Sequence, residues 1–122
     1  MQDLVGIIRT ESELRQAHEA LGKLRERAER VSVTGGRAYN PGWNLATDLP
    51  AMLTVSTLVA SGALERKESR GGHTRDDHPG PDPEFGKINL VQRVSAEGEF
   101  TIAPEPLPQM PPELAALFEE AK

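Results

Sequence analysis

Six side chains able to act as acids, bases, metal ligands or anion-binding groups lie within nine residues of a glycine-rich stretch. They are Arg70, His73, Arg75, Asp76, Asp77 and His78. Three kinds of chemistry are open to this set. His73, Asp77 and His78 offer the nitrogen and oxygen ligands of a metal site. A His–Asp pair could serve a hydroxyl nucleophile, Ser69 or Thr74.

The third kind of chemistry is recognition, because Arg70, His73 and Arg75 could bind an anion or dock on an acidic surface. Against all three stands a plainer interpretation, a solvated loop. The two histidines are five residues apart in a loop that does nothing to preorganise them, and no nucleophile elbow or oxyanion-hole pattern surrounds the hydroxyls. On residue chemistry alone, the solvated loop is favoured.

Two helices are expected to position this loop. Thr10 and Glu13 have the spacing of a capping box. After them, apolar residues recur at alternating intervals of three and four, which predicts a helix with a narrow seam for partner helices: Leu14, Ala17, Leu21, Leu24, Ala28 and Val31. Gly35 and Gly36 end this stretch. The charged residues on the other faces are typical of a solvated helix surface.

A second helix is expected from about Leu45 to about Ser69, with Gly71-Gly72 as its stop. Before it, Asn40-Pro41-Gly42 reads as a turn, and we expect Tyr39 and Trp43 to plug one end of a bundle.

The amino-terminal segment, residues 3–9, predicts a short helix. A helix of about two turns is marginal alone, so it either packs tightly or ends a longer helix.

In the carboxy-terminal third, apolar residues recur every second residue, which is the period of a strand and not of a helix. Ile88 and Leu90 predict one strand within residues 87–94, and Phe100 and Ile102 predict a second, so that the two form a hairpin. A proline-rich extended connector and a short helix over residues 112–118 follow.

Composition limits the function. The chain has 122 residues, a net charge of −5 and no cysteine. Disulfides, thiolate metal sites and cysteine nucleophiles are therefore excluded, and nucleic-acid binding is disfavoured because basic residues are not in excess. The chain is too small for a large enzyme with its own deep cleft. No apolar run approaches the ~20 residues of a membrane span, and no secretion signal is visible at the amino terminus. Neither glycine pair has a phosphate-loop or dinucleotide-binding pattern.

These observations predict a mainly α fold, a three-helix antiparallel bundle of the spectrin-repeat kind. A long polar loop, a carboxy-terminal β-hairpin and a short terminal helix complete it. The bundle is expected over residues 1–75, and the loop, hairpin and tail over residues 76–122 of the same single domain.

Two segments carry a family resemblance. NPGWNLATDL (residues 40–49) and ERKESRGGHTRDDHP (residues 65–79) resemble the carboxy-terminal region of the succinate dehydrogenase/fumarate reductase flavoprotein subunit. The run from Glu68 to Pro79 is the most specific element, and L-aspartate oxidases carry a related version. VGIIR (residues 5–9) and DPEF (residues 82–85) are also similar to the family, so the resemblance covers essentially the whole chain.

The resemblance implies an FAD-dependent succinate:quinone oxidoreductase that passes electrons to an iron–sulfur subunit and a quinone. In that family the FAD fold, the flavin-linking histidine and the substrate-binding residues lie upstream of this domain. The resemblance therefore implies no catalytic, cofactor-binding or metal site in this chain. It implies a domain-docking motif at Arg70, His73, Arg75 and Asp76, with the flavin domain of the same subunit as the partner.

We accordingly expect the chain to be a fragment that lacks FAD and is inactive by itself. We expect the assembled complex to be cytoplasmic and peripheral to the cytoplasmic membrane, without direct membrane insertion by this chain. The alternative is a stand-alone helical interaction module. A reading frame that extends hundreds of residues upstream favours the first hypothesis, and a start codon at Met1 favours the second. A small metal enzyme, the third hypothesis, predicts stoichiometric metal in the purified chain.

Overall fold

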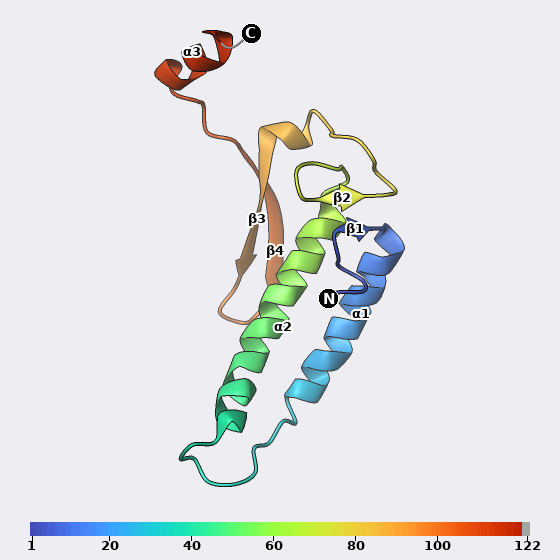
Figure 1. The fold of residues 1–122 in the computed structure, drawn as a ribbon, viewed down its shortest axis with the longest axis vertical. Helices are drawn as coiled ribbons and strands as arrows, with labels where there is room; N and C mark the ends of the chain where they lie inside the picture. Colours follow the sequence, from blue (N-terminus) through green and yellow to red (C-terminus); the bar gives the residue numbers. More distant parts are fainter. Residues whose placement is uncertain (121–122) are drawn as a thin grey trace.

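The fold is a pair of antiparallel helices beside a β-hairpin, with a short helix at the carboxy terminus (Figure 1). The computed structural model describes residues 1–120. The elements are, in chain order, β1 (Ile8–Arg9), α1 (Glu11–Ala28), α2 (Pro41–Glu65), β2 (Thr74–Arg75), a 3-10 turn (Phe85–Lys87), β3 (Ile88–Val94), β4 (Phe100–Pro106) and α3 (Pro112–Glu120). The expected main features, helices with a carboxy-terminal hairpin, are confirmed.

The start of α1 is the capping box that the sequence predicts. The Glu13 amide donates to Thr10 Oγ1 at 3.3 Å, and the Thr10 amide donates to Glu13 Oε2 at 2.9 Å. Leu14, Ala17 and Leu21 are buried against α2 and its surroundings. The rest of the predicted seam is confirmed only in part. Ala28, the last helical residue, packs against this core, whereas Leu24 is 43% exposed and Val31 lies beyond the end of α1.

The expected beginning and end of α2 are wrong by several residues. Asn40 caps the helix through its side chain, which accepts from the Gly42 amide at 3.0 Å, and Pro41 is the first helical residue. The three residues Asn40-Pro41-Gly42, predicted to form a turn, start the helix instead, because proline is preorganised for the first turn and asparagine is a good cap. At the other end the helix stops at Glu65, and the motif residues from Glu68 onward lie in the following loop.

The predicted three-helix bundle is also wrong. In place of the helix expected over residues 3–9, the chain makes one turn, in which the Val5 amide donates to the Met1 carbonyl at 2.8 Å, and then enters β1. Gly6 and the β-branched Ile7 and Ile8 disfavour a helix here, and β1 gains backbone hydrogen bonds from β2. The bundle therefore has two helices in the described residues, and the third helix, α3, lies at the far end of the tail (Figure 1).

The hairpin is confirmed and is longer than predicted. Its antiparallel register pairs Ile88 with Pro106 and Val94 with Phe100, and Gly98 takes a φ of +84° in the turn. Pro104 lies in β4 rather than in the proline-rich connector. A two-stranded sheet has only edge strands, where proline is tolerated.

The core of this fold is small, and much apolar surface remains outside it. The buried apolar residues are Val5, Leu14, Ala17, Leu21, Leu53, Ala60 and Ala63. One side of α2 is exposed from Leu45 to Val59, with Leu45 69%, Met52 62% and Val55 59% exposed. Tyr39 is fully exposed and Trp43 is 38% exposed, so the expectation that these aromatics plug the bundle is wrong.

The apolar character of α2 also corrects the sequence-based view of membrane spans. By length and composition alone, α2 could cross a bilayer. One face of it packs on α1, however, and that pairing supplies the core. The opposite face of α2, which carries Leu45, Met52 and Val55, is not covered by the described residues.

Candidate functional site

The loop that follows α2 returns to the amino-terminal segment and joins it as a strand. β2 pairs with β1 in parallel, with Ile8 opposite Thr74 and Arg9 opposite Arg75. The Asp76 amide extends the pairing by donating to the Arg9 carbonyl at 3.0 Å. Residues 70–78 are therefore held between the end of α2 and the start of α1, which lie side by side because the helices are antiparallel.

Arg75 is the centre of this junction and is completely buried. Its Nη1 donates to the carbonyls of Ala63 at 3.0 Å and Leu64 at 3.3 Å, in the last turn of α2. The final carbonyls of a helix have no partner within the helix and carry its negative dipole end. A buried guanidinium satisfies both requirements, so Arg75 acts as the carboxy-terminal cap of α2.

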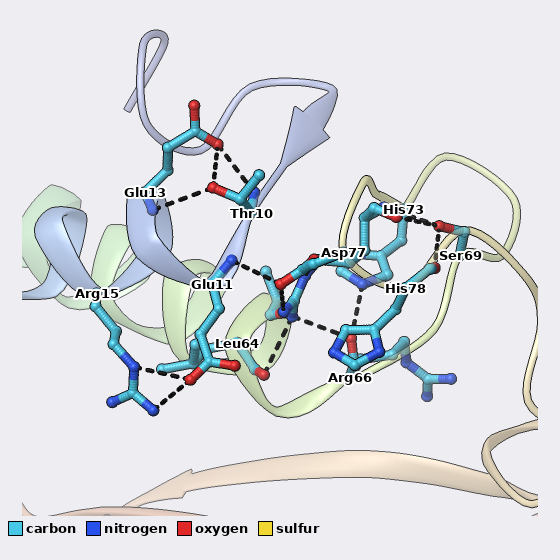
Figure 2. Close-up of polar contacts among 12 residues, drawn as sticks. Thr10, Glu11, Glu13, Arg15, Leu64, Arg66, Ser69, His73, Asp77 and His78 are labelled. Carbon is cyan, nitrogen blue, oxygen red and sulfur yellow. Dashed lines mark hydrogen bonds and ion pairs between the residues drawn. The ribbon is translucent and has the colours of Figure 1, made fainter.

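Asp77 does the complementary work at the start of α1. Its Oδ2 accepts from the Glu11 amide at 2.9 Å (Figure 2). Its two oxygens accept from Arg75 Nε and Nη2 at 2.7 Å each. The bidentate pair with Arg75 lowers the pKa of Asp77 well below its usual range. Arg75 and Asp77 together connect the negative end of α2 to the positive end of α1. We call this pair the helix-end clamp.

A second buried charge, Glu68, organises the other half of the loop. Its carboxylate is fully buried and accepts from Arg66 Nη1, from Arg70 Nε at 3.1 Å and from the Asp82 amide at 2.8 Å. These bonds outweigh the effect of burial, and the pKa of Glu68 falls to about 2. Arg70 also donates to the Asp82 carbonyl at 3.0 Å. Glu68 therefore ties the chain after α2 to the segment before β3.

His73 connects the two halves of the loop. Its Nδ1 lies 3.0 Å from Arg9 Nη1, and its Nε2 lies 3.0 Å from the Arg66 carbonyl. Since a guanidinium can only donate, Nδ1 is the acceptor and Nε2 carries the proton. Burial lowers the pKa of His73, and the charges of Arg9, Arg75 and Arg66 act in the same direction. His73 is therefore held neutral in one tautomer.

The arrangement does not favour the two catalytic interpretations of the loop. The Ser69 hydroxyl lies 2.7 Å from the His78 carbonyl and accepts from the Arg75 amide at 2.8 Å, so it shapes the backbone. Both ring nitrogens of His73 are engaged by Arg9 and the Arg66 carbonyl, as described above. Among the described residues, the acid and imidazole groups that converge are Glu11, Asp77 and His78, but both Asp77 oxygens already accept hydrogen bonds from Arg75.

The four residues of the predicted docking motif differ in what they offer to a partner. Arg75 is fully inside the fold, and His73 is half-buried. Arg70, whose side chain is 46% exposed, and Asp76 remain accessible. Glu68 and Arg9 lie in segments that carry the family resemblance, but sequence reasoning gave neither residue a role, although both belong to the hydrogen-bond network. One sequence pattern could have indicated this network. Arg66, Glu68 and Arg70 alternate in charge at intervals of two residues, and such residues share one side of an extended chain.

A family model described as "Fumarate reductase flavoprotein C-term" matches residues 1–115. The fumarate reductase flavoprotein subunit of Helicobacter pylori strain J99 is 34% identical over 121 residues, which cover 97% of this chain and 17% of the relative. Among solved structures, Mycobacterium smegmatis Sdh1 in complex with UQ1 is 46% identical with a TM-score of 0.90, over 99% of this chain and 21% of that one.

A more distant structure, Escherichia coli quinol fumarate reductase FrdA with a single substitution, is 27% identical. Its TM-score is 0.76, over 88% of this chain and 19% of that one. The chain thus spans about a fifth, or less, of the length of the relatives it matches.

Proposed function

The chain belongs to the family of carboxy-terminal domains of the succinate dehydrogenase/fumarate reductase flavoprotein subunit, and from this premise we propose that it packs on the flavin domain of such a subunit and stabilises the assembled enzyme. The whole enzyme would interconvert succinate and fumarate and pass electrons to an iron–sulfur subunit and a quinone. It would sit in the cytoplasm at the surface of the cytoplasmic membrane.

The residues present do not fit FAD itself. The described part of the chain has two separate two-stranded sheets, and no strand leads through a glycine-rich turn into a helix as a dinucleotide site requires. The flavin and substrate sites would therefore lie in the rest of the subunit, and no chemical step is assigned to this chain.

One observation carries the proposal: the outer face of α2 is apolar and uncovered. Leu45, Met52 and Val59 repeat every seven residues, Val55 lies between them, and all four are 45–69% exposed. Seven-residue spacing of apolar side chains is the pattern of a helix seam that packs on a partner. Burying such a face against protein is worth about 25 cal/mol for each Å² of apolar surface, so it favours association with the larger part of the subunit.

The motif loop supports this role in two ways. The helix-end clamp fixes the helices that display the apolar face. Arg70 and Asp76 are accessible at one end of the helix pair and would contact carboxylates or backbone groups of the flavin domain. Arg75, being buried, would support docking indirectly by holding the loop in place.

The first test is Met52→Asp in the full-length subunit. Placing a carboxylate in a face that becomes buried is costly, so we expect lower flavin retention and less assembled complex. The isolated chain should keep its stability, because Met52 is 62% exposed in it. Met110→Asp, a substitution of the same type at a residue 53% exposed in the tail, is the matched control.

Equal assembly of the Met52 and control variants would refute the proposed packing. If the α2 face instead binds lipid, the purified chain will sediment with vesicles, and Met52→Asp will abolish this sedimentation. The docking motif is tested separately by Arg70→Ala in the full-length subunit, with Arg93→Ala as the control. Unchanged flavin content, assembly and activity would rule out a docking role for Arg70.

A further inference from the structure

An open cleft of about 630 Å³ lies between the end of α2 and strand β3. Arg9, Arg66 and His73 line it from the side of the motif loop, and Asn89 and Gln92 line it from β3. A smaller cleft of about 310 Å³ adjoins it, shares Arg66, His73 and Asn89, and adds Arg70. Among the described side chains that line the two clefts there is no carboxylate, although the chain as a whole has a net charge of −5.

The two arginines of the larger cleft have donors to spare. Arg9 uses Nε on the Gly6 carbonyl at 2.6 Å and Nη1 on His73. Arg66 uses Nη1 on Glu68 and on the Phe85 carbonyl. Within residues 1–120, Nη2 of each guanidinium is left without a hydrogen-bond partner. Both charges are also held in place, Arg9 by the His73 ring and Arg66 over the face of the Phe85 ring at 5.4 Å.

Gln92 also lines the larger cleft, but its Oε1 is buried and has no hydrogen-bond partner among the described residues. Because that oxygen is shielded from solvent, the polar groups that a bound molecule would meet first are the two arginines. A molecule that suits this cleft therefore presents a hydrogen-bond acceptor to them.

We propose that the cleft binds an Asp or Glu side chain. This side chain belongs to a polypeptide segment in the remainder of the subunit, which covers this domain. A carboxylate matches the planar geometry of guanidinium groups better than other biological acceptors in proteins. The source of the segment rests on the proposed function, whereas the carboxylate chemistry rests on this chain alone.

The chemistry is tested by NMR titration of the 122-residue chain with N-acetyl-glutamate methylamide, and with the glutamine analogue as the matched ligand. We expect the backbone amides of residues 89–92 and the Arg66 Nε–H to shift saturably with the glutamate ligand only. Arg66→Gln should weaken binding at least ~10-fold, because a charged hydrogen-bond pair is lost. Arg93→Gln, on the outer part of β3, should leave it unchanged.

Arg66→Lys provides a second variant should Arg66→Gln disturb Glu68. It keeps the charge and loses the planar fork, so binding of intermediate strength is expected. Equal shifts with both ligands, or none with either, would overturn the proposal. Acetate binding as tightly as the blocked glutamate would also overturn it, because the site would then belong to a small anion.

The source of the segment is tested by labelling in the full-length subunit. Arginine-specific labelling reports on Arg66, with the exposed Arg15 as the reference, and radical oxidation of Met52 reports on the α2 face. Protection of both Arg66 and Met52 supports both proposals. Protection of Met52 with Arg66 as reactive as in the isolated chain refutes the cleft proposal alone. Protection of Arg66 without Met52 refutes the α2 packing alone.

Discussion

Arg75→Met removes the cation of the helix-end clamp while keeping a long, apolar side chain in its place. The substitution leaves Asp77, whose side chain is 30% exposed, without its bidentate partner, and it frees the Ala63 and Leu64 carbonyls at the end of α2. Losing one partner of a buried pair costs about 3–5 kcal/mol. The partial exposure of Asp77 favours the low end, and the lost cap adds about 1–2 kcal/mol.

We therefore expect Arg75→Met to lower the free energy of unfolding by about 4 kcal/mol. That is a large fraction of the ~5–15 kcal/mol typical of a domain. In urea unfolding followed by circular dichroism, with a slope of about 1.5 kcal/mol per molar, the midpoint would fall by about 2.7 M. If Arg75→Met does not fold, Arg75→Lys is expected to cost about half as much, because it keeps the charge and loses the fork.

Arg93→Met is the matched control for this experiment. Arg93 is paired with Glu105 at 2.6 Å, but the two side chains are 61% and 46% exposed. Exposed pairs contribute about 0–1 kcal/mol, so the control should change stability little. If Arg75→Met and Arg93→Met cost the same, below about 1 kcal/mol, the clamp does not stabilise the fold and the reasoning is refuted.

Three further outcomes are expected. Stability should fall as the pH drops below 6.5, the ordinary pKa of histidine, because burial lowers the pKa of His73 in the folded chain and favours its neutral form. His73→Gln should make the urea midpoint depend less on pH across that range. An unchanged dependence on pH would contradict the assignment of this effect to His73. Glu68→Gln should lower the free energy of unfolding at neutral pH. The parent chain keeps the contribution of Glu68 above pH 4.5, the ordinary pKa of glutamate, and loses it as the pH falls towards 2, where the folded pKa lies. Acid titration of both proteins, monitored by circular dichroism, compares them. Thr10→Ala should lower stability by about 1 kcal/mol in calorimetry, and no loss would show that the capping box is dispensable.

The parts of the fold that the sequence predicts correctly depend on local patterns. The capping box at Thr10 and the alternation of Ile88 with Leu90 each involve residues that are close in the chain. The structures of residues 3–9 and of the start of α2 are not predicted correctly. A short apolar segment can form either a helix or a strand, and a proline can lie either in a turn or in the first turn of a helix. In both places a specific contact decides, namely pairing with β2 in one case and the Asn40 cap in the other.

The candidate site was found by its residue types, but its internal contacts could not be predicted. A run of charged residues beside glycines is usually solvated, and nothing local distinguishes the buried Arg75 from the accessible Arg70. The difference arises from α2 ending at Glu65, which brings free carbonyls next to the returning loop. Such a contact depends on where two helices end relative to one another, and residue spacing does not specify that.

The helix-end clamp has a consequence for the alignment of α1 and α2. The seam between them is made partly of alanines, Ala17, Ala60 and Ala63 among them, and small side chains by themselves resist sliding only weakly. Sliding by one helical turn would move the helix ends apart by about 5.4 Å, and the hydrogen bonds of Arg75 and Asp77 would not survive it. The alignment of the pair is thus set at one end by two charged residues, so the apolar side chains that α2 offers to a covering surface keep a fixed position relative to α1 and the motif loop.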